Sequence, residues 1–413
     1  MKFLTVLAIA LAISSVQSVN WAVIVAGSNG YWNYRHQADS CHAYQILKTA
    51  GYAASRIIHF AYNDIANNSQ NPIPGKIYNK PDGTDVYAGC VIDYQGANVN
   101  SANYLNVLKG IVTASTPKVL ASTSADKVFL NFTDHGAPGL IAFPSDYLYA
   151  PDLQAALQYM NTNNMYSKLV YYLEACESGS MFTSLPTTWN IYATTAANPT
   201  ESSWGCYCGS QATVGGVNIG SCLGDLYSVV WMEDSDKKTA GETLQAQFQV
   251  ILQLVTQSHP QQYGDLTWTS QLVADWINGP VTLSAEDQKA VELRTKSLVN
   301  SRDIKLHYLI NRHANEMSEN TMNELNEEIM MRKLFDDIFT GIQTLHADVP
   351  VANDTDFDCY KDIINFFEAQ CGRFTEYGMK YMRSFYDICA NKKEVVVDAK
   401  KMVMESCSAG KLF

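Results

Sequence analysis

Two residues of this chain, Cys176 and His135, are of the types that together can cleave an acyl bond. Each follows an apolar stretch, residues 128–133 before the histidine and residues 169–173 before the cysteine. A thiol attacks as its thiolate, and a nearby imidazole can take the thiol proton and later protonate a leaving amine. Either residue alone could have only a structural role. Together, at the ends of successive apolar stretches, they indicate a nucleophile and its base.

The segment between the two stretches predicts how they are positioned. Leu153, Leu157 and Met160 fall on one face of a predicted helix at residues 151–164. A strand, helix and strand in this order run their two strands parallel, so both carboxyl ends reach one edge of the sheet. Cys176 and His135 are therefore expected at the same edge, where the backbone N–H groups of Gly136 and Cys176 could form an oxyanion hole.

The rest of the chain divides into two parts near residue 280. Residues 280–413 carry 39 charged side chains, against 31 in residues 1–279, and an Asn-Gly-Pro break lies between them. The first part alternates apolar runs with helical patterns, which predicts an α/β fold with a mainly parallel sheet covered on both faces. The second part predicts charged helices. Strands are expected at 21–26, 57–62, 128–133, 169–176 and 189–195, helices at 36–51, 104–114, 151–164, 243–255, 284–299 and 323–345, and a long loop at 63–91.

The N-terminal residues and the composition indicate where in the cell the protein is made and sent. Residues 1–18 have the pattern of a removable signal peptide, with one lysine, an apolar stretch and small residues before a cleavage point after Ser18. No later stretch is long and apolar enough to span a membrane. The formal net charge of −12 disfavours nucleic acid as a partner. We therefore expect a secreted chain without a membrane anchor.

Ten cysteines fit a secreted protein that uses disulfides. Four of them lie in the predicted helical tail, where two disulfides are expected, and the sequence permits three pairings. A metal site is the alternative, but no paired short spacing supports it. Cys206 and Cys208 could be a ligand or redox pair, or one could form a loop disulfide with Cys222 or Cys90. The tail cysteines are Cys359, Cys371, Cys389 and Cys407.

Six segments in order resemble the legumain family of asparaginyl endopeptidases, which are caspase-like cysteine peptidases. The resemblance spans residues 20–279, although the caspase motif Gln-Ala-Cys followed by Gly is absent. It implies a caspase-like three-layer sandwich with a mainly parallel sheet and a C-terminal, all-helical, disulfide-linked prodomain. The implied domains are a signal peptide at 1–18, a peptidase domain at 19–279, an activation segment at 280–322 and a prodomain at 323–413. The segments are IVAGSNG at 24–30, NYRHQAD at 33–39, TDHG at 133–136, EACESGS at 174–180, TTAANP at 194–199 and WMEDSD at 231–236.

The resemblance implies roles for individual residues. Cys176 and His135 match the catalytic dyad, and Asn33 matches the residue that supports the histidine. The pocket for the side chain before the scissile bond is implied to consist of Arg35, Glu174 and Asp225, with Ser202 and Ser203 as its wall. The chemistry agrees, because a carboxamide needs a donor beside acceptors. The alternative for each carboxylate is a solvated position at the end of a strand or helix.

The same family resemblance implies that the tail covers the active site until acidification. It implies disulfides Cys359–Cys389 and Cys371–Cys407. Self-cleavage is expected in the asparagine-bearing segment. Candidate self-cleavage sites are Asn300, Asn311, Asn315 and Asn320. Asn67 and Asn353 are candidate glycosylation sites.

These observations together predict a zymogen of a cysteine endopeptidase that cuts after Asn, and after Asp at low pH. We expect protein and peptide substrates, the prodomain as intramolecular inhibitor, cystatin-like inhibitors, and a lysosomal, vacuolar or secreted location. No cofactor or metal is expected. One alternative is a transamidase or ligase acting through the same acyl-enzyme, although the anchor-attaching transamidase subunit would carry a membrane helix. The other is a non-catalytic binding protein, which an intact dyad disfavours.

Overall fold

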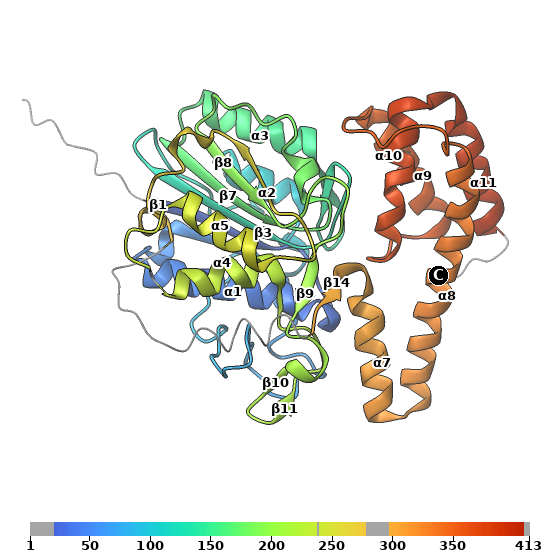
Figure 1. The fold of residues 1–413 in the computed structure, drawn as a ribbon, viewed down its shortest axis with the longest axis horizontal. Helices are drawn as coiled ribbons and strands as arrows, with labels where there is room; N and C mark the ends of the chain where they lie inside the picture. Colours follow the sequence, from blue (N-terminus) through green and yellow to red (C-terminus); the bar gives the residue numbers. More distant parts are fainter. Residues whose placement is uncertain (1–19, 238, 278–296, 409–413) are drawn as a thin grey trace, which may run out of the picture.

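The computed structural model describes residues 20–237, 239–277 and 297–408, which form an α/β body and a helical tail (Figure 1). The predicted signal peptide lies outside the described residues, and so does most of the helix predicted at 284–299. Its last described residue, Val299, belongs to a short strand instead. Among the described residues, no helix is both long and apolar enough to cross a membrane.

A six-stranded sheet forms the centre of the body, in the order β13-β8-β7-β3-β1-β2. All neighbouring pairs are parallel except β13 with β8. The predicted mainly parallel sheet is therefore confirmed, and the antiparallel edge strand is an addition that the sequence did not indicate. The strands are β1 (Asn20–Ala26), β2 (Ile57–Phe60), β3 (Lys127–Thr133), β7 (Lys168–Glu174), β8 (Ile191–Thr195) and β13 (Gln261–Gly264).

Helices cover both faces of this sheet, which gives three layers (Figure 1). Successive residues of β1 point to opposite faces, so Ala22 and Ile24 join one core while Val23 and Val25 join the other. The valine and isoleucine side chains among them contribute about 1.5–3 kcal/mol each when fully buried. The first core is completed by α1 (Tyr34–Thr49), α4 (Leu226–Lys237) and α5 (Leu244–Leu254), and the second by α2 (Ser101–Leu108) and α3 (Ala150–Thr162).

Two local features differ from the sequence prediction. Helix α2 begins at Ser101 because the Asn100 side chain accepts a hydrogen bond from the N–H of Asn103, and it ends before Gly110, which has a positive φ. The predicted span of 104–114 was wrong at both ends. Helix α4 was missed because nearly all of its side chains are buried, which removes the amphipathic pattern that marks a surface helix.

The tail is a helical unit with its own core. Its helices are α7 (Ile304–Glu316), α8 (Glu319–Thr344), α9 (Phe357–Cys371), α10 (Met382–Asn391) and α11 (Val396–Ser408). Disulfides Cys359–Cys389 and Cys371–Cys407 tie α9 to α10 and α11, in the pairing that the family resemblance implied. Helix α7 lies within the segment that was predicted as an activation segment.

The tail packs against a small three-stranded antiparallel sheet of the body, which is called the hairpin below. It consists of β4 (Gly136–Ala137), β5 (Leu140–Ala142) and β6 (Tyr147–Tyr149), directly after His135. Leu140 and Tyr149 are buried in one cluster with α8, α9 and α10. The tail therefore packs on the sheet edge to which the dyad was assigned. Two further disulfides, Cys41–Cys90 and Cys208–Cys222, lie within the body.

Candidate active site

The loops that follow β3 and β7 bring His135 and Cys176 to the same edge of the sheet. Thr133 and Glu174 are paired at the ends of these parallel strands, and the Asp134 N–H donates to the Glu174 carbonyl at 3.1 Å. A Cβ on Gly136 would lie 2.3 Å from the Cys176 carbonyl oxygen. Only glycine permits this approach of the histidine loop to the cysteine loop.

Asn33 determines which nitrogen of His135 can act as a base. The Asn33 Nδ2 donates to the Asn29 carbonyl at 2.9 Å, so its Oδ1 faces His135 Nε2, also at 2.9 Å. An amide oxygen only accepts, and His135 Nε2 therefore carries the proton. His135 Nδ1 is left with its lone pair and has no hydrogen-bond partner among the described residues. This nitrogen is the one that can accept a thiol proton.

Cys176 is buried beside Ser203. The Ser203 N–H donates to Cys176 Sγ at 3.4 Å, and the Ser203 hydroxyl lies 3.8 Å from the sulfur. Burial raises the pKa of the Cys176 thiol, and burial lowers the pKa of His135 to about 3. With the tail in place, the thiol and the imidazole are therefore both held in their uncharged forms.

The predicted pocket residues form one buried group. The Arg35 Nε donates to Asp225 Oδ1 at 2.8 Å, and Glu174 Oε2 accepts from the N–H and the hydroxyl of Ser228, both at 3.2 Å. Three polar atoms of this group are buried without a hydrogen-bond partner among the described residues: Arg35 Nη2, Glu174 Oε1 and Asp225 Oδ2. This group thus combines a donor and acceptors without hydrogen-bond partners, and His36 Nε2 lies 3.4 Å from Asp225 Oδ2.

The acidic side chains of this group all have raised pKa values. Burial raises the pKa of Glu174 well above its ordinary value, and the charge of Asp225 adds to the effect. Burial also raises the pKa of Asp225 and of Asp39, which lies behind it. These carboxyl groups are therefore not all ionised together, so the single positive charge of Arg35 need not balance three negative ones.

A segment of the tail lies across the rim of the pocket as an added strand. Strand β14 (Val299–Asn300) pairs antiparallel with β9 (Trp204–Cys206), and the Ser301 N–H donates to the Ser203 carbonyl at 3.1 Å. The Ser203 and Ser301 hydroxyls are 3.3 Å apart. The predicted wall residue Ser203 is thus covered, whereas Ser202 is half-buried. An extended peptide can bind to β9 in the same way.

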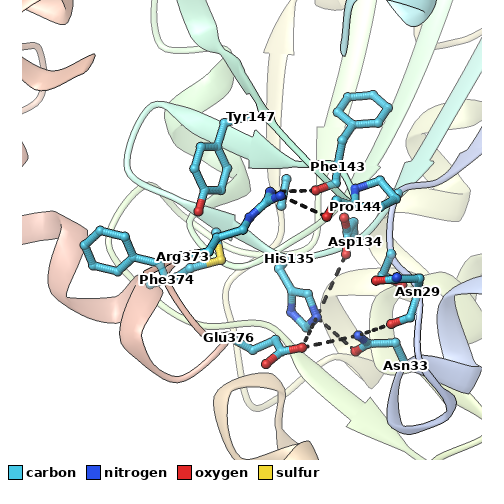
Figure 2. A pocket seen from close by; sticks show the side chains of 14 residues that line it. Asn29, Asn33, Asp134, His135, Phe143, Pro144, Tyr147, Arg373, Phe374 and Glu376 are labelled. Carbon is cyan, nitrogen blue, oxygen red and sulfur yellow. Dashed lines mark hydrogen bonds and ion pairs between the residues drawn. The ribbon is translucent and has the colours of Figure 1, made fainter. Parts of the chain in front are cut away.

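Arg302 and Glu376 of the tail reach the dyad itself. The Arg302 Nη2 donates to the Gly136 carbonyl at 2.6 Å and to Glu177 Oε2 at 2.7 Å. Glu376 Oε1 accepts from the Trp32 indole N–H at 2.8 Å and lies 4.0 Å from His135 Nε2 (Figure 2). Sequence reasoning missed both residues, because neither belongs to a local pattern and each reaches the site only through docking of the tail.

A cavity of about 180 Å³ remains between the histidine and the tail (Figure 2). His135, Asp134, Glu376 and Arg373 line it, among others. The guanidinium of Arg373 donates to backbone carbonyls of the hairpin at 2.8–2.9 Å. The tail therefore closes over the dyad through polar contacts around a small cavity.

Two groups of side chains have spacings that could suit a metal ion. In the group of Cys41, His59 and Cys90, the two sulfurs form a disulfide and are not available as thiolates. The other group is His36, Asp134 and His135, at the candidate catalytic centre. There the His36 Nδ1 lies 2.6 Å from the Ser28 hydroxyl, and Asn33 occupies His135 Nε2. Both groups are explained without a metal.

A thiol and an imidazole at the ends of neighbouring parallel strands, with a polar pocket beside them and a tail over both, define a cysteine peptidase with a built-in inhibitor. Comparison with known proteins agrees. The profile of the Peptidase C13 family matches residues 20–280, and that of the legumain prodomain matches residues 319–407. The chain belongs to the peptidase C13 family and is a cysteine endopeptidase with its prodomain as an intramolecular inhibitor.

Similar proteins come from plants and animals. A vacuolar-processing enzyme of Vicia sativa is 40% identical over 407 residues, which cover 90% of this chain and 83% of that protein. A hemoglobinase of Schistosoma japonicum is 42% identical over 382 residues, which cover 89% and 88% of the two chains. A caspase-1 structure from Spodoptera frugiperda aligns with a TM-score of 0.37 at 10% identity, over 60% of this chain and 88% of the caspase.

Proposed function

We propose that the protein hydrolyses peptide bonds on the carboxyl side of asparagine, and of aspartate at low pH. The observation that carries this proposal is the buried polar group with an unpaired donor, Arg35 Nη2, and an unpaired acceptor, Glu174 Oε1, beside Asp225. A carboxamide has one acceptor oxygen and two N–H donors, which complement these atoms. Each buried group left unpaired costs about 1–3 kcal/mol, so other side chains bind less well. A protonated aspartate side chain resembles the carboxamide.

The mechanism is thiol acyl transfer. The Cys176 sulfur attacks the substrate carbonyl carbon while His135 Nδ1 takes the thiol proton. The N–H groups of Gly136 and Cys176 stabilise the oxyanion. The carbon–nitrogen bond then breaks as His135 protonates the leaving amine, and water hydrolyses the thioester with His135 again as base. Asn33 supports this sequence because its contact with Nε2 leaves Nδ1 free to exchange protons.

The protein is made as a zymogen in which the tail blocks the pocket and the dyad. Strand β14 occupies the edge of β9 that an extended substrate would use. Arg302 contacts the backbone of Gly136 and the side chain that follows Cys176. Because the buried thiol has a raised pKa, the tail also suppresses formation of the thiolate.

Acid favours release of this tail through His135. Its pKa falls from an ordinary 6.5 to about 3 in the docked state, because burial disfavours the charged ring. The released state therefore binds a proton as the pH falls through 6.5, whereas the docked state binds it only near 3. Lowering the pH between these values shifts the equilibrium toward release, by up to about 1.4 kcal/mol per pH unit.

Two carboxylates of the interface respond to acid in opposite directions. Burial alone would raise the pKa of Glu376, but Lys305, His135 and the Trp32 indole outweigh it and lower the pKa to about 2. Glu376 therefore favours release only between pH 4.5 and 2. Burial raises the pKa of Glu177, which favours docking in acid. Of His135, Glu376 and Glu177, His135 is thus the group that responds first as a compartment acidifies.

Self-cleavage is proposed near the turn between α7 and α8. Asn315 lies in the last turn of α7, Asn320 lies in the first turn of α8, and Met317 between them is 80% exposed. An exposed turn opens more readily into an extended substrate than a helix centre, which disfavours Asn311. Asn300 is held in β14, and its side chain accepts from the Arg302 N–H at 2.9 Å instead of entering the pocket.

The proposed setting is an acidic compartment of the secretory route, a lysosome or a vacuole. The name of the vacuolar-processing enzymes, which are similar over most of this chain, supports this location. Asn67 and Asn353 are both exposed, as glycosylation would require, whereas the sequon at Asn131 is buried in β3. Cystatin-like proteins are proposed as inhibitors, with asparagine-containing proteins as substrates.

One assay tests the proposed activity. The full-length protein is incubated at pH 5 and then given peptides that differ only in Asn, Asp or Gln before one bond, at pH 5 and pH 7. We expect cleavage after Asn at both values and after Asp only at pH 5, with no turnover by Cys176→Ser. Mass spectrometry separates hydrolysed from ligated products. Absence of cleavage after Asn once the tail has been removed would contradict the proposal.

A further inference from the structure

We propose that His42 is a positioning residue of the asparagine pocket, defined as Arg35, Glu174 and Asp225. Its ring, protonated on both nitrogens, holds Asn79, and Asn79 in turn holds Asp39 and the backbone that carries Asp225. Loss of one proton from His42 therefore loosens the pocket from behind. The inference rests on the proposed function only for the identity of the side chain that the pocket binds.

The hydrogen bonds around Asn79 determine the protonation of His42. The Asn79 Nδ2 donates to the Leu223 carbonyl at 3.0 Å and to Asp39 Oδ1 at 2.7 Å. A carbonyl oxygen can only accept, so this end of the amide is the NH2 group and the other end is oxygen. That oxygen lies 2.7 Å from His42 Nδ1, which must therefore carry a proton.

The second ring nitrogen faces a carboxylate. His42 Nε2 lies 3.0 Å from Asp236 Oδ2, which accepts a hydrogen bond when ionised. Burial alone would raise the pKa of Asp236, but His42 and Lys80 outweigh it and lower the pKa to about 2. Asp236 is thus ionised in mild acid, and both nitrogens of His42 act as donors. A ring with two donors is an imidazolium.

The charged surroundings of His42 favour this form. On α4, Asp236 contacts the ring, and Glu233 lies one turn earlier; in the loop after β2, Lys80 lies 3.3 Å from Asp236 and 3.2 Å from Asp82. Asp39 is on the same helix as His42. Burial alone would lower the pKa of His42, but the charge of Asp236 and the hydrogen bonds to Asp236 and Asn79 outweigh it and raise the pKa.

Tight packing transmits the position of Asn79 to the pocket. Asp39 Oδ2 accepts from the backbone N–H of Asp225 at 3.2 Å. A Cβ on Gly224, just before Asp225, would lie 2.8 Å from Asn79 Nδ2 and 2.3 Å from a Val229 methyl carbon. The amide and this backbone lie too close for a methyl group between them, so a shift of Asn79 acts on strand β12 (Gly224–Asp225) through this contact and through Asp39.

The direction of the pH effect follows from the hydrogen bonds. The link is complete below the pKa of His42 and is lost as the pH rises through that raised pKa. A neutral ring has one N–H for two acceptors, so it must release Asn79 or turn a lone pair toward Asp236. We expect KM for asparagine substrates to rise above this pH, with little change in kcat, because His42 does not touch the dyad.

The first test does not depend on activity. Full-length Cys176→Ser protein with 13C-labelled histidine is titrated by NMR, and the His42 signal is identified by its loss in His42→Gln. We expect His42 to titrate above 6.5, and Asp236→Asn to lower that value. Titration below 6.5, or no response to Asp236→Asn, would overturn the inference.

The second test follows KM against pH after removal of the tail, with the asparagine peptide. We expect KM of the unmodified protein to rise roughly tenfold through the His42 titration, as loss of one charged hydrogen bond predicts. Asp236→Asn should move the midpoint of this rise in KM to lower pH, and His42→Gln should abolish the pH-dependent rise. His59→Gln, which replaces a buried histidine of β2 bonded to the Val91 carbonyl, should leave the midpoint in place.

The outcomes separate the two proposals. A flat KM profile in the unmodified protein, or an identical midpoint in Asp236→Asn, overturns the role of His42 even when asparagine peptides are cleaved. Failure to cleave any asparagine peptide overturns the proposed function instead, while the NMR titration still decides whether His42 is an imidazolium.

Discussion

The interior of the body and its interface with the tail are held by different forces. The sheet is buried between two apolar clusters, in which residues such as Ile24 and Leu130 are fully buried. The tail contacts the body through both kinds of group: Tyr308 and Leu309 of α7 join a core of the body, whereas charged and polar groups lie around the dyad. Arg302 contacts Glu177, Glu376 contacts Trp32, and Arg383 donates to the Pro199 carbonyl at 2.6 Å.

This difference suits parts that must stay together and parts that must separate. Apolar burial does not itself depend on pH, so acid acts on the polar contacts before it acts on the apolar interior. A polar interface gains or loses protons, so acid can open it without unfolding either part. Four substitutions, in order of decreasing effect, test whether the interface and the interior respond separately.

Arg302→Ala should remove latency, which here means that the full-length protein is inactive until it is treated with acid. The change deletes a buried ion pair with Glu177 and leaves that carboxylate unpaired, which typically costs about 3–5 kcal/mol. Docking of the tail should weaken by roughly 10²–10³-fold, and cleavage of asparagine peptides should appear at pH 7 without acid treatment. Unchanged latency with an unchanged melting temperature of the body would show that Arg302 does not hold the tail.

Glu174→Gln should affect the pocket and not the tail. An amide of equal size loses the acceptor that faces the substrate carboxamide, at about 1.5–3 kcal/mol. We expect kcat/KM for asparagine peptides to fall about 10–100-fold while alkylation of Cys176 by iodoacetamide continues at its usual rate. Equal loss of both would mean that Glu174 also controls the thiol.

His135→Gln in a Cys176→Ser background should flatten the pH dependence of tail release. The substitution removes the group whose pKa is about 3 when docked and 6.5 ordinarily. Tail release is followed by hydrogen exchange of residues 299–302. Between pH 6.5 and 4.5, release by the variant should depend less on pH, because up to one proton fewer binds when the tail is released. An unchanged response would assign the acid sensitivity to other groups.

Lys361→Ala should have the smallest effect. Its ion pair with Asp152 joins tail and body at 2.8 Å, but both side chains are at least one-third exposed. Such pairs contribute about 0–1 kcal/mol. Latency at pH 7 should remain within a few-fold of the unmodified protein, which makes this variant the matched control for Arg302→Ala. Strong activation would contradict the distinction between buried and exposed contacts.

Prediction from sequence was most accurate where a pattern is local. Strand β7 and the cysteine after it form one continuous signal, and β3 and His135 form another. Helix α4 was missed because it is buried on all sides, so its sequence lacks the alternation of apolar and polar residues with a helical period. The edge strand β13 was missed because its residues Gln261–Gly264 are partly buried and polar, unlike the apolar strands beside it.

The residues that could perform the chemistry, and the strands that carry them, are predictable from sequence, because strand alternation and the parallel connection follow from nearby residues. The nitrogen of His135 that serves as base, and the tail residues that cover it, depend on how the whole chain packs. Asn33 lies 102 positions from His135, and Trp32 lies 344 positions from Glu376. Contacts of that separation form only when the whole chain packs, so no local pattern records them.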